Sequence, residues 1–139
     1  MTTAQSDVET IRSGLAALNR RDIDGMLATL RPDVELVPLR AVLDGTVYTG
    51  HDGLRRWLTD MTEDWDEFHI DVHDVRSLDD GRVLVLARFQ ARGNASGVRV
   101  DWPAAWICRM TEGKVAHLQF YADAEAALAA ADTPAASGI

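Results

Sequence analysis

Apolar and polar residues alternate along the second half of the chain. The longest example is the segment 98–110, whose apolar positions are Val98, Val100, Trp102, Ala104, Trp106, Cys108 and Met110. Successive side chains of a strand point to opposite sides, so these residues should share one face. Shorter alternating segments at 68–73, 82–92 and 115–122 are separated by glycine-containing turns. Together they predict a mainly antiparallel sheet with one buried face.

The first half of the chain shows the helical period instead. Apolar residues recur at spacings of three and four over residues 8–20, 23–30 and 54–65. This spacing predicts three amphipathic helices. Ser6 begins a capping-box pattern before the first helix, and Asp22 can cap the second.

The remaining segments complete a single-domain organisation. Residues 34–39 should form a short strand, and Thr49 should cap the third helix. Asp123 can cap a short C-terminal helix, and 132–139 should be a flexible tail of a domain spanning 1–131. Helices followed by a long antiparallel sheet imply an α+β fold, in which the three N-terminal helices cover one sheet face.

The opposite face of the predicted sheet is polar but poor in Lys and Glu. Its side chains include Arg88, Gln90, His117, Gln119 and Tyr121. Protein interfaces favour aromatic residues and Arg over Lys and Glu, so we interpret this face as a homodimer interface. The alternative is a solvated sheet surface.

Bulk properties narrow the range of partners and cofactors. The formal net charge of −8 over 139 residues argues against nucleic acid and anionic membranes as partners. No apolar run approaches the ~20 residues needed to span a bilayer, and Met1–Thr10 lacks the pattern of a signal peptide, so a cytoplasmic protein is expected. Cys108 is the only cysteine, and no Cys/His spacing resembles a zinc site. We expect no metal and no cofactor.

Several segments resemble one known family along nearly the whole chain. They are Ala17-Leu18-Asn19-Arg20-Arg21-Asp22, Pro32-Asp33-Val34-Glu35, Gly45-Thr46-Val47-Tyr48-Thr49-Gly50-His51-Asp52-Gly53, Gly113-Lys114-Val115, Tyr121-Ala122-Asp123 and Glu125-Ala126-Ala127-Leu128. This pattern resembles the NTF2-like superfamily and, within it, the SnoaL-like branch. The resemblance implies a cone made of a curved antiparallel sheet and three helices, with an apolar ligand at its mouth and dimers formed through the sheet backs. The superfamily includes isomerases, dehydratases, epoxide hydrolases, polyketide cyclases and non-enzymatic binding proteins, so fold does not specify function.

The resemblance also tests one activity, ketosteroid isomerisation. Those enzymes use an aspartate base, a tyrosine and a protonated aspartic acid. The corresponding positions here are Val37, Gly14 and Trp106. All three chemical groups are missing, so ketosteroid isomerisation by that mechanism is excluded.

The alternation and the resemblance together place a largely apolar set inside the cone. Its members are Leu18, Val37, Trp57, Met61, Phe89, Trp102, Ala104, Trp106, Leu118 and Phe120. Converging tryptophans favour a ligand pocket, although aromatic residues at such spacings also build ordinary cores.

Glu35 is the best candidate for a catalytic carboxylate. It shares a strand face with Val37, which the resemblance points inward, and a carboxyl beside tryptophans has its charged form disfavoured. In the alternative, Val34 and Leu36 point inward, and Glu35 is solvated or pairs with Arg40.

The other candidates also have structural alternatives, which are the more common roles of such residues. His51 could move protons near the mouth of the cone, or could simply occupy the first turn of a helix. Tyr48 could supply a hydroxyl group or be a packed aromatic. Asp123 is expected to act as a helix cap, and His117 to lie on the outer face.

These observations predict a dimeric SnoaL-like cone that binds a small apolar or aromatic molecule. Any catalysis would be cofactor-free acid–base chemistry, such as isomerisation, cyclisation, dehydration or epoxide opening. Glu35 would be the base, with His51 or Tyr48 as its polar partner. The alternatives are a binding protein without catalysis and a dimeric scaffold whose tryptophans fill the cone.

Overall fold

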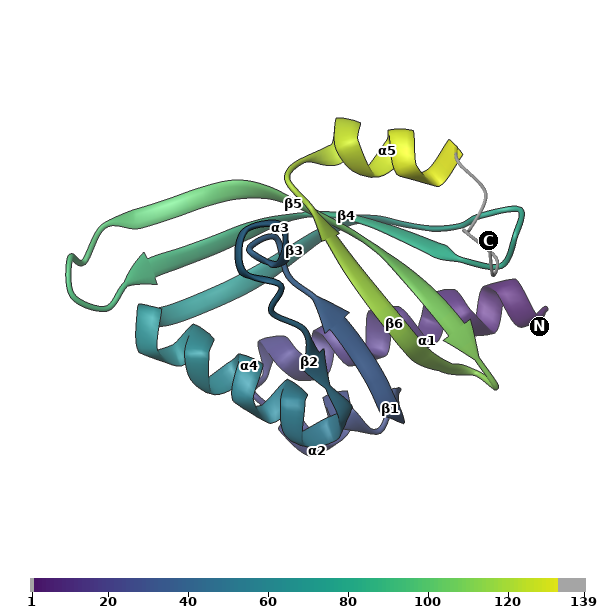
Figure 1. Cartoon of the computed structure of the whole chain (residues 1–139), viewed down its shortest axis with the longest axis horizontal. Coiled ribbons are helices and arrows are strands. Elements are labelled where there is room, and N and C mark those ends of the chain that lie inside the picture. Colours follow the sequence, from purple (N-terminus) through teal and green to yellow (C-terminus); the bar gives the residue numbers. More distant parts are fainter. Residues whose placement is uncertain (1, 133–139) are drawn as a thin grey trace.

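A computed structural model describes residues 2–132 as six strands and five helices (Figure 1). The helices are α1 (Thr3–Asn19), α2 (Ile23–Leu27), α3 (Ala41–Asp44), α4 (Gly50–Asp64) and α5 (Ala124–Asp132). The strands are β1 (Leu30–Val37), β2 (Tyr48–Thr49), β3 (Trp65–Ser77), β4 (Val83–Gly93), β5 (Arg99–Thr111) and β6 (Lys114–Tyr121). The expected α+β class is confirmed. Asp132 is the last residue of α5. The rest of the predicted flexible tail, 133–139, lies outside the described residues.

The strands form one curved, open sheet in the order β2-β1-β6-β5-β4-β3 (Figure 1). Strands β3 to β6 pair antiparallel with their neighbours in sequence, as the alternation predicts. Strand β1 begins at Leu30 rather than at the expected Val34, and it pairs parallel with β6. This parallel pair joins the helical half of the chain to the sheet.

Helices lie on both sides of the sheet (Figure 1). Helices α1, α2 and α4 cover one face, where the main hydrophobic core contains Val34, Leu36, Val83, Val85 and Trp106. None of the helices within residues 2–132 combines the length and the hydrophobicity that a membrane crossing requires.

The C-terminal helix α5 packs on the opposite face of the sheet. It completes a second apolar cluster in which Leu84, Ala105, Ile107 and Ala127 are buried and Tyr121 is half-buried. Along β4 and β5, these residues alternate with those of the main core, so their side chains point to the opposite face of the sheet. Part of the outer sheet face is therefore covered by the chain itself.

The rest of the outer face keeps a polar character. Arg88 forms an ion pair with Asp101, with Nε and Oδ1 2.6 Å apart. His117 lies opposite Glu35 on the neighbouring strand, and burial together with the charge of Arg109 lowers the pKa of His117. The homodimer through Arg88, Gln90, His117, Gln119 and Tyr121 stays a prediction.

The helix caps differ from expectation at the first helix. Helix α1 begins one turn earlier than predicted, because Thr2 and Gln5 form the capping box and Ser6 lies inside the helix. The predicted caps Asp22 and Asp123 are confirmed, since each carboxylate accepts a hydrogen bond from a backbone amide three residues later. Thr49 precedes α4 as expected, but its side chain makes no cap hydrogen bond.

Candidate functional site

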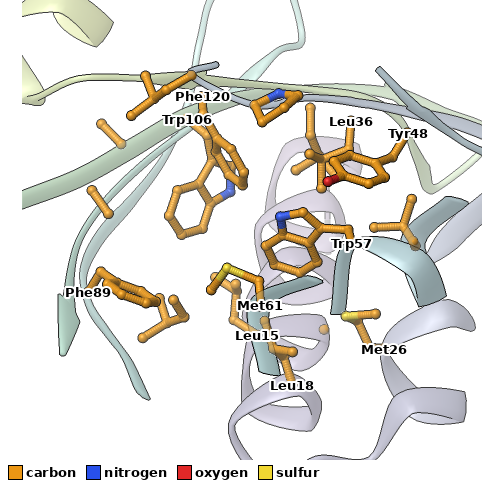
Figure 2. Close-up of a pocket in the computed structure, with 18 of the residues that line it drawn as sticks. Leu15, Leu18, Met26, Leu36, Tyr48, Trp57, Met61, Phe89, Trp106 and Phe120 are labelled. Carbon is orange, nitrogen blue, oxygen red and sulfur yellow. The ribbon is translucent and has the colours of Figure 1, made fainter. Parts of the chain in front are cut away.

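A cavity of about 530 Å³ lies between the sheet and the helices α1, α2 and α4. Except for Val37, every residue predicted to face the cone interior borders it: Leu18, Trp57, Met61, Phe89, Trp102, Ala104, Trp106, Leu118 and Phe120. Figure 2 shows the side chains of Trp57, Trp106 and Phe120 directed into this space. The lining is mostly apolar, so a ligand in the cavity would exchange water for hydrocarbon and aromatic surfaces.

Aromatic rings build two walls of the cavity. In one wall Trp65 contacts Phe89 and Trp102 edge-on, with ring centroids 5.4 and 5.5 Å apart. In the other, Phe120 lies 6.2 Å from Trp57 and 5.6 Å from Trp106. Such packing holds the rings in fixed orientations. The walls therefore present preformed flat surfaces.

The expected inward direction of Glu35 and Val37 is wrong. Val34 and Leu36 of the same strand are buried, and Leu36 borders the cavity. Because strand side chains alternate, Glu35 points to the other face, where it is solvent-exposed opposite His117 of β6. The alternative direction for this strand is therefore the one observed, and it takes Glu35 away from the cavity.

The polar end of the cavity is a cluster of three residues, Arg40, Tyr48 and Asp60. The Tyr48 hydroxyl donates a hydrogen bond to Oδ2 of Asp60 over 2.6 Å. The Arg40 guanidinium donates to the Tyr48 oxygen and lies 3.5 Å from the same Asp60 oxygen. Tyr48 comes from β2, Asp60 from α4 and Arg40 from the segment before α3. The cluster thus ties together three parts of the cavity wall.

Tyr48 is the most buried member of this cluster, with 3% of its surface exposed. Burial raises the pKa of its hydroxyl, and the hydrogen bond to Asp60 raises that pKa further. The phenol therefore stays protonated at neutral pH and acts as a donor to Asp60.

His51 lies outside this cluster and does not border the cavity. Its Nε2 is 3.1 Å from the carbonyl oxygen of Leu30. Because a carbonyl oxygen only accepts, Nε2 must carry the proton and donate it. His51 therefore ties the start of α4 to β1.

The positions tested for ketosteroid chemistry bring no acid to the cavity. Gly14 and Trp106 border it, but a Cβ atom at position 14 would lie 2.7 Å from Oγ1 of Thr29. Within residues 2–132, the carboxylates that border the cavity are Asp60 and Asp64, both on α4. In the same residues, no group of three or more His, Cys, Asp or Glu side chains gathers at a distance suited to a metal ion.

Two of the cluster residues were not singled out as site residues by the sequence. Asp60 lies between Trp57 and Met61 in the sequence, at the edge of the apolar stripe of a predicted helix. That placement was the available signal. Arg40 carries no such signal, because its contact with Tyr48 and Asp60 depends on how the segment 38–47 folds back.

Gly53 sets the distance between α4 and Tyr48. A Cβ atom there would lie 2.9 Å from the carbonyl carbon of Tyr48, which is backbone and cannot move alone. We expect Gly53→Ala to lower the free energy of unfolding by about 1–2 kcal/mol, although alanine normally favours a helix over glycine. Urea unfolding measures this. Thr62→Ala, at an exposed position of α4, is the control and should change stability by less than about 0.5 kcal/mol. Equal stability of Gly53→Ala and the unmodified chain would contradict the close contact.

A family model shows the family of the chain, and solved structures show its fold. The model of the SnoaL-like domain matches residues 11–118. An uncharacterized protein of Mycobacterium tuberculosis (strain H37Rv) is 31% identical over 124 residues, which cover 87% of this chain and 92% of that protein. A putative polyketide cyclase from Xanthomonas campestris superposes with a TM-score of 0.76 at 19% identity, over 89% of this chain and 95% of its own. TerC, co-crystallized with polyporic acid, superposes with a TM-score of 0.75 at 22% identity, over 92% of this chain and 99% of its own.

Proposed function

Because the chain belongs to the SnoaL-like domain family, we propose that it binds a small apolar or aromatic molecule inside its cone. The cavity of about 530 Å³ is the observation that carries this proposal. Pockets for small molecules typically have volumes of about 300–1,000 Å³ and are apolar with a few polar groups. Both properties fit this cavity.

The cavity offers different chemistry at its two ends. The rings of Trp57, Trp106 and Phe120 would contact the apolar body of a ligand, and stacking against them favours a flat molecule. Arg40 and Asp60 lie at the polar end, and each is partly exposed. A single polar substituent on the ligand would therefore fix its orientation.

The name of one similar structure, a putative polyketide cyclase, favours a metabolite of the polyketide kind. The open cavity also speaks against a scaffold in which the tryptophans fill the cone.

A neutral fluorescent dye, N-phenyl-1-naphthylamine, tests the proposal directly. We expect saturable enhancement of its fluorescence with one site per chain. Ala104→Leu places extra carbon atoms in the cavity and should weaken dye binding at least tenfold, a change of about 1.4 kcal/mol. Ala95→Leu, in the exposed β4–β5 turn, is the matched control and should bind as the unmodified chain does. Absence of saturable binding, or equal loss in both variants, would contradict the proposal.

A further inference from the structure

We propose that Asp60 is the catalytic base of the cavity, and that Tyr48 and Arg40 are the positioning residues that hold it. This inference rests on the proposed function, because it assumes that a ligand occupies the cavity. It assigns the acid–base role to a residue of α4 instead of Glu35, which faces away from the cavity.

The first support is location. Asp60 borders the cavity one residue before Met61 and three residues after Trp57, which also border it. A carboxylate at this position can reach a molecule that lies against the Trp57 ring. Glu35 and His51 cannot, because neither borders the cavity.

The second support is that the contacts to the Asp60 carboxylate involve only one of its two oxygens. The Tyr48 hydroxyl donates to Oδ2, and the Arg40 guanidinium lies 3.5 Å from the same atom. In the part of the chain that the structure describes, neither of these contacts uses Oδ1. One oxygen thus fixes the orientation of the carboxylate, and the other stays available to accept a proton.

The third support is the contrast with Asp64, the other carboxylate on the cavity wall. Asp64 lies one helical turn further along α4 and is solvent-exposed. No hydrogen bond between its carboxylate and another described side chain holds it in one orientation. Proton transfer requires a base held within hydrogen-bond reach of its target, and Asp60 meets this condition better.

The chemistry that follows is the removal of a proton from a carbon of the bound molecule. The probe 5-nitrobenzisoxazole is a flat aromatic compound whose ring opening reports this step. Asp60 takes the proton from C3, the C–H electron pair becomes the third bond of a nitrile, and the N–O bond breaks. Its electron pair remains on the oxygen of 2-cyano-4-nitrophenolate, and Asp60 then returns the proton to water.

The experiment measures the release of this phenolate by its absorbance. The unmodified chain should open the probe faster than buffer alone. Asp60→Asn keeps the shape of the side chain but removes the base, and it should lower kcat/KM at least tenfold. Asp52→Asn is the matched control in the same helix, on the solvent side, and should leave kcat/KM unchanged.

The Tyr48→Phe variant tests whether Tyr48 positions Asp60, separately from any effect of the substitution on folding. We expect it to lower kcat severalfold while KM and the affinity for N-phenyl-1-naphthylamine stay the same, because it removes the hydroxyl that bonds Asp60 and Arg40 but keeps the packed ring. A variant that merely misfolds would lose the dye affinity too.

The outcomes distinguish this inference from the proposed function. Dye binding without ring opening above the buffer rate would overturn the role of Asp60 and leave the binding function intact. An unchanged rate in Asp60→Asn, or a tenfold loss in Asp64→Asn instead, would also overturn it. Absence of dye binding would overturn both.

Discussion

Replacing Trp106 with alanine should lower the free energy of unfolding by about 3–5 kcal/mol. Trp106 is 4% exposed, and its ring meets the Phe120 ring edge-on at 5.6 Å. Its removal would lose the transfer free energy of a large side chain and leave a void beside the existing cavity. Phe120, on the neighbouring strand, would lose its main ring contact on the sheet.

Trp102→Ala is the matched comparison on the same strand and the same face. Trp102 is 50% exposed, so its loss should cost only about 1–2 kcal/mol. Guanidinium unfolding followed by circular dichroism measures both variants. Equal destabilisation of the two variants would contradict the assignment of Trp106 to the core.

The difference between these two tryptophans shows what alternation can and cannot predict. Period-two spacing correctly placed both rings on the cavity face of β5. It could not predict their exposure, because that depends on where the helices end. Trp102 pairs with Phe89 toward the β4–β5 turn, where the sheet extends beyond the helices that cover it (Figure 1).

The error at Glu35 has a similar origin. Strand β1 has apolar residues at 34, 36 and 37, so its alternation does not identify one face. The resemblance favoured an inward Val37, whereas packing against α4 and the sheet buries Val34 and Leu36. A shift of one residue exchanges the two faces, and with them the candidate base.

Local patterns could not predict how the polar cluster assembles. Arg40, Tyr48 and Asp60 lie on three different elements and meet only after the segment between β1 and α4 has folded over the cavity. Periodicity describes one element at a time. The apolar cavity wall was therefore largely predictable, whereas Tyr48 was the one member of the polar end that the sequence identified as a candidate.

Asn19→Ala should destabilise the protein by about 2–4 kcal/mol, through the loss of two hydrogen bonds to one backbone unit. The Asn19 side chain accepts from the amide of Ile70 and donates to the carbonyl of Ile70, both over 2.9 Å. Ile70 belongs to β3, the edge strand of the sheet, so no further strand is available to satisfy these groups. Asn19 thus fastens the end of α1 to the sheet edge.

Arg21 strengthens this attachment two residues earlier in β3. Its guanidinium donates to the carbonyl oxygen of Phe68 and lies 3.8 Å from the centre of the Phe68 ring. The same guanidinium also donates to the Leu18 carbonyl at the end of α1, over 2.8 Å. The Arg21 backbone adopts a positive φ of 61°, which turns the chain between α1 and α2 toward the strand.

Urea unfolding of Asn19→Ala tests whether this attachment stabilises the fold. Asn94→Ala is the matched control, because the side-chain amide of Asn94 makes one exposed hydrogen bond of 3.3 Å to the Glu63 carbonyl. That control should change the free energy of unfolding by less than about 0.5 kcal/mol. Asn19→Asp keeps the acceptor for the Ile70 amide but sets a carboxylate against the Ile70 carbonyl, so it should be nearly as unstable as Asn19→Ala. If Asn19→Ala unfolds at the same urea concentration as Asn94→Ala, water replaces the side chain at the edge of β3 and the helix is held by apolar packing alone.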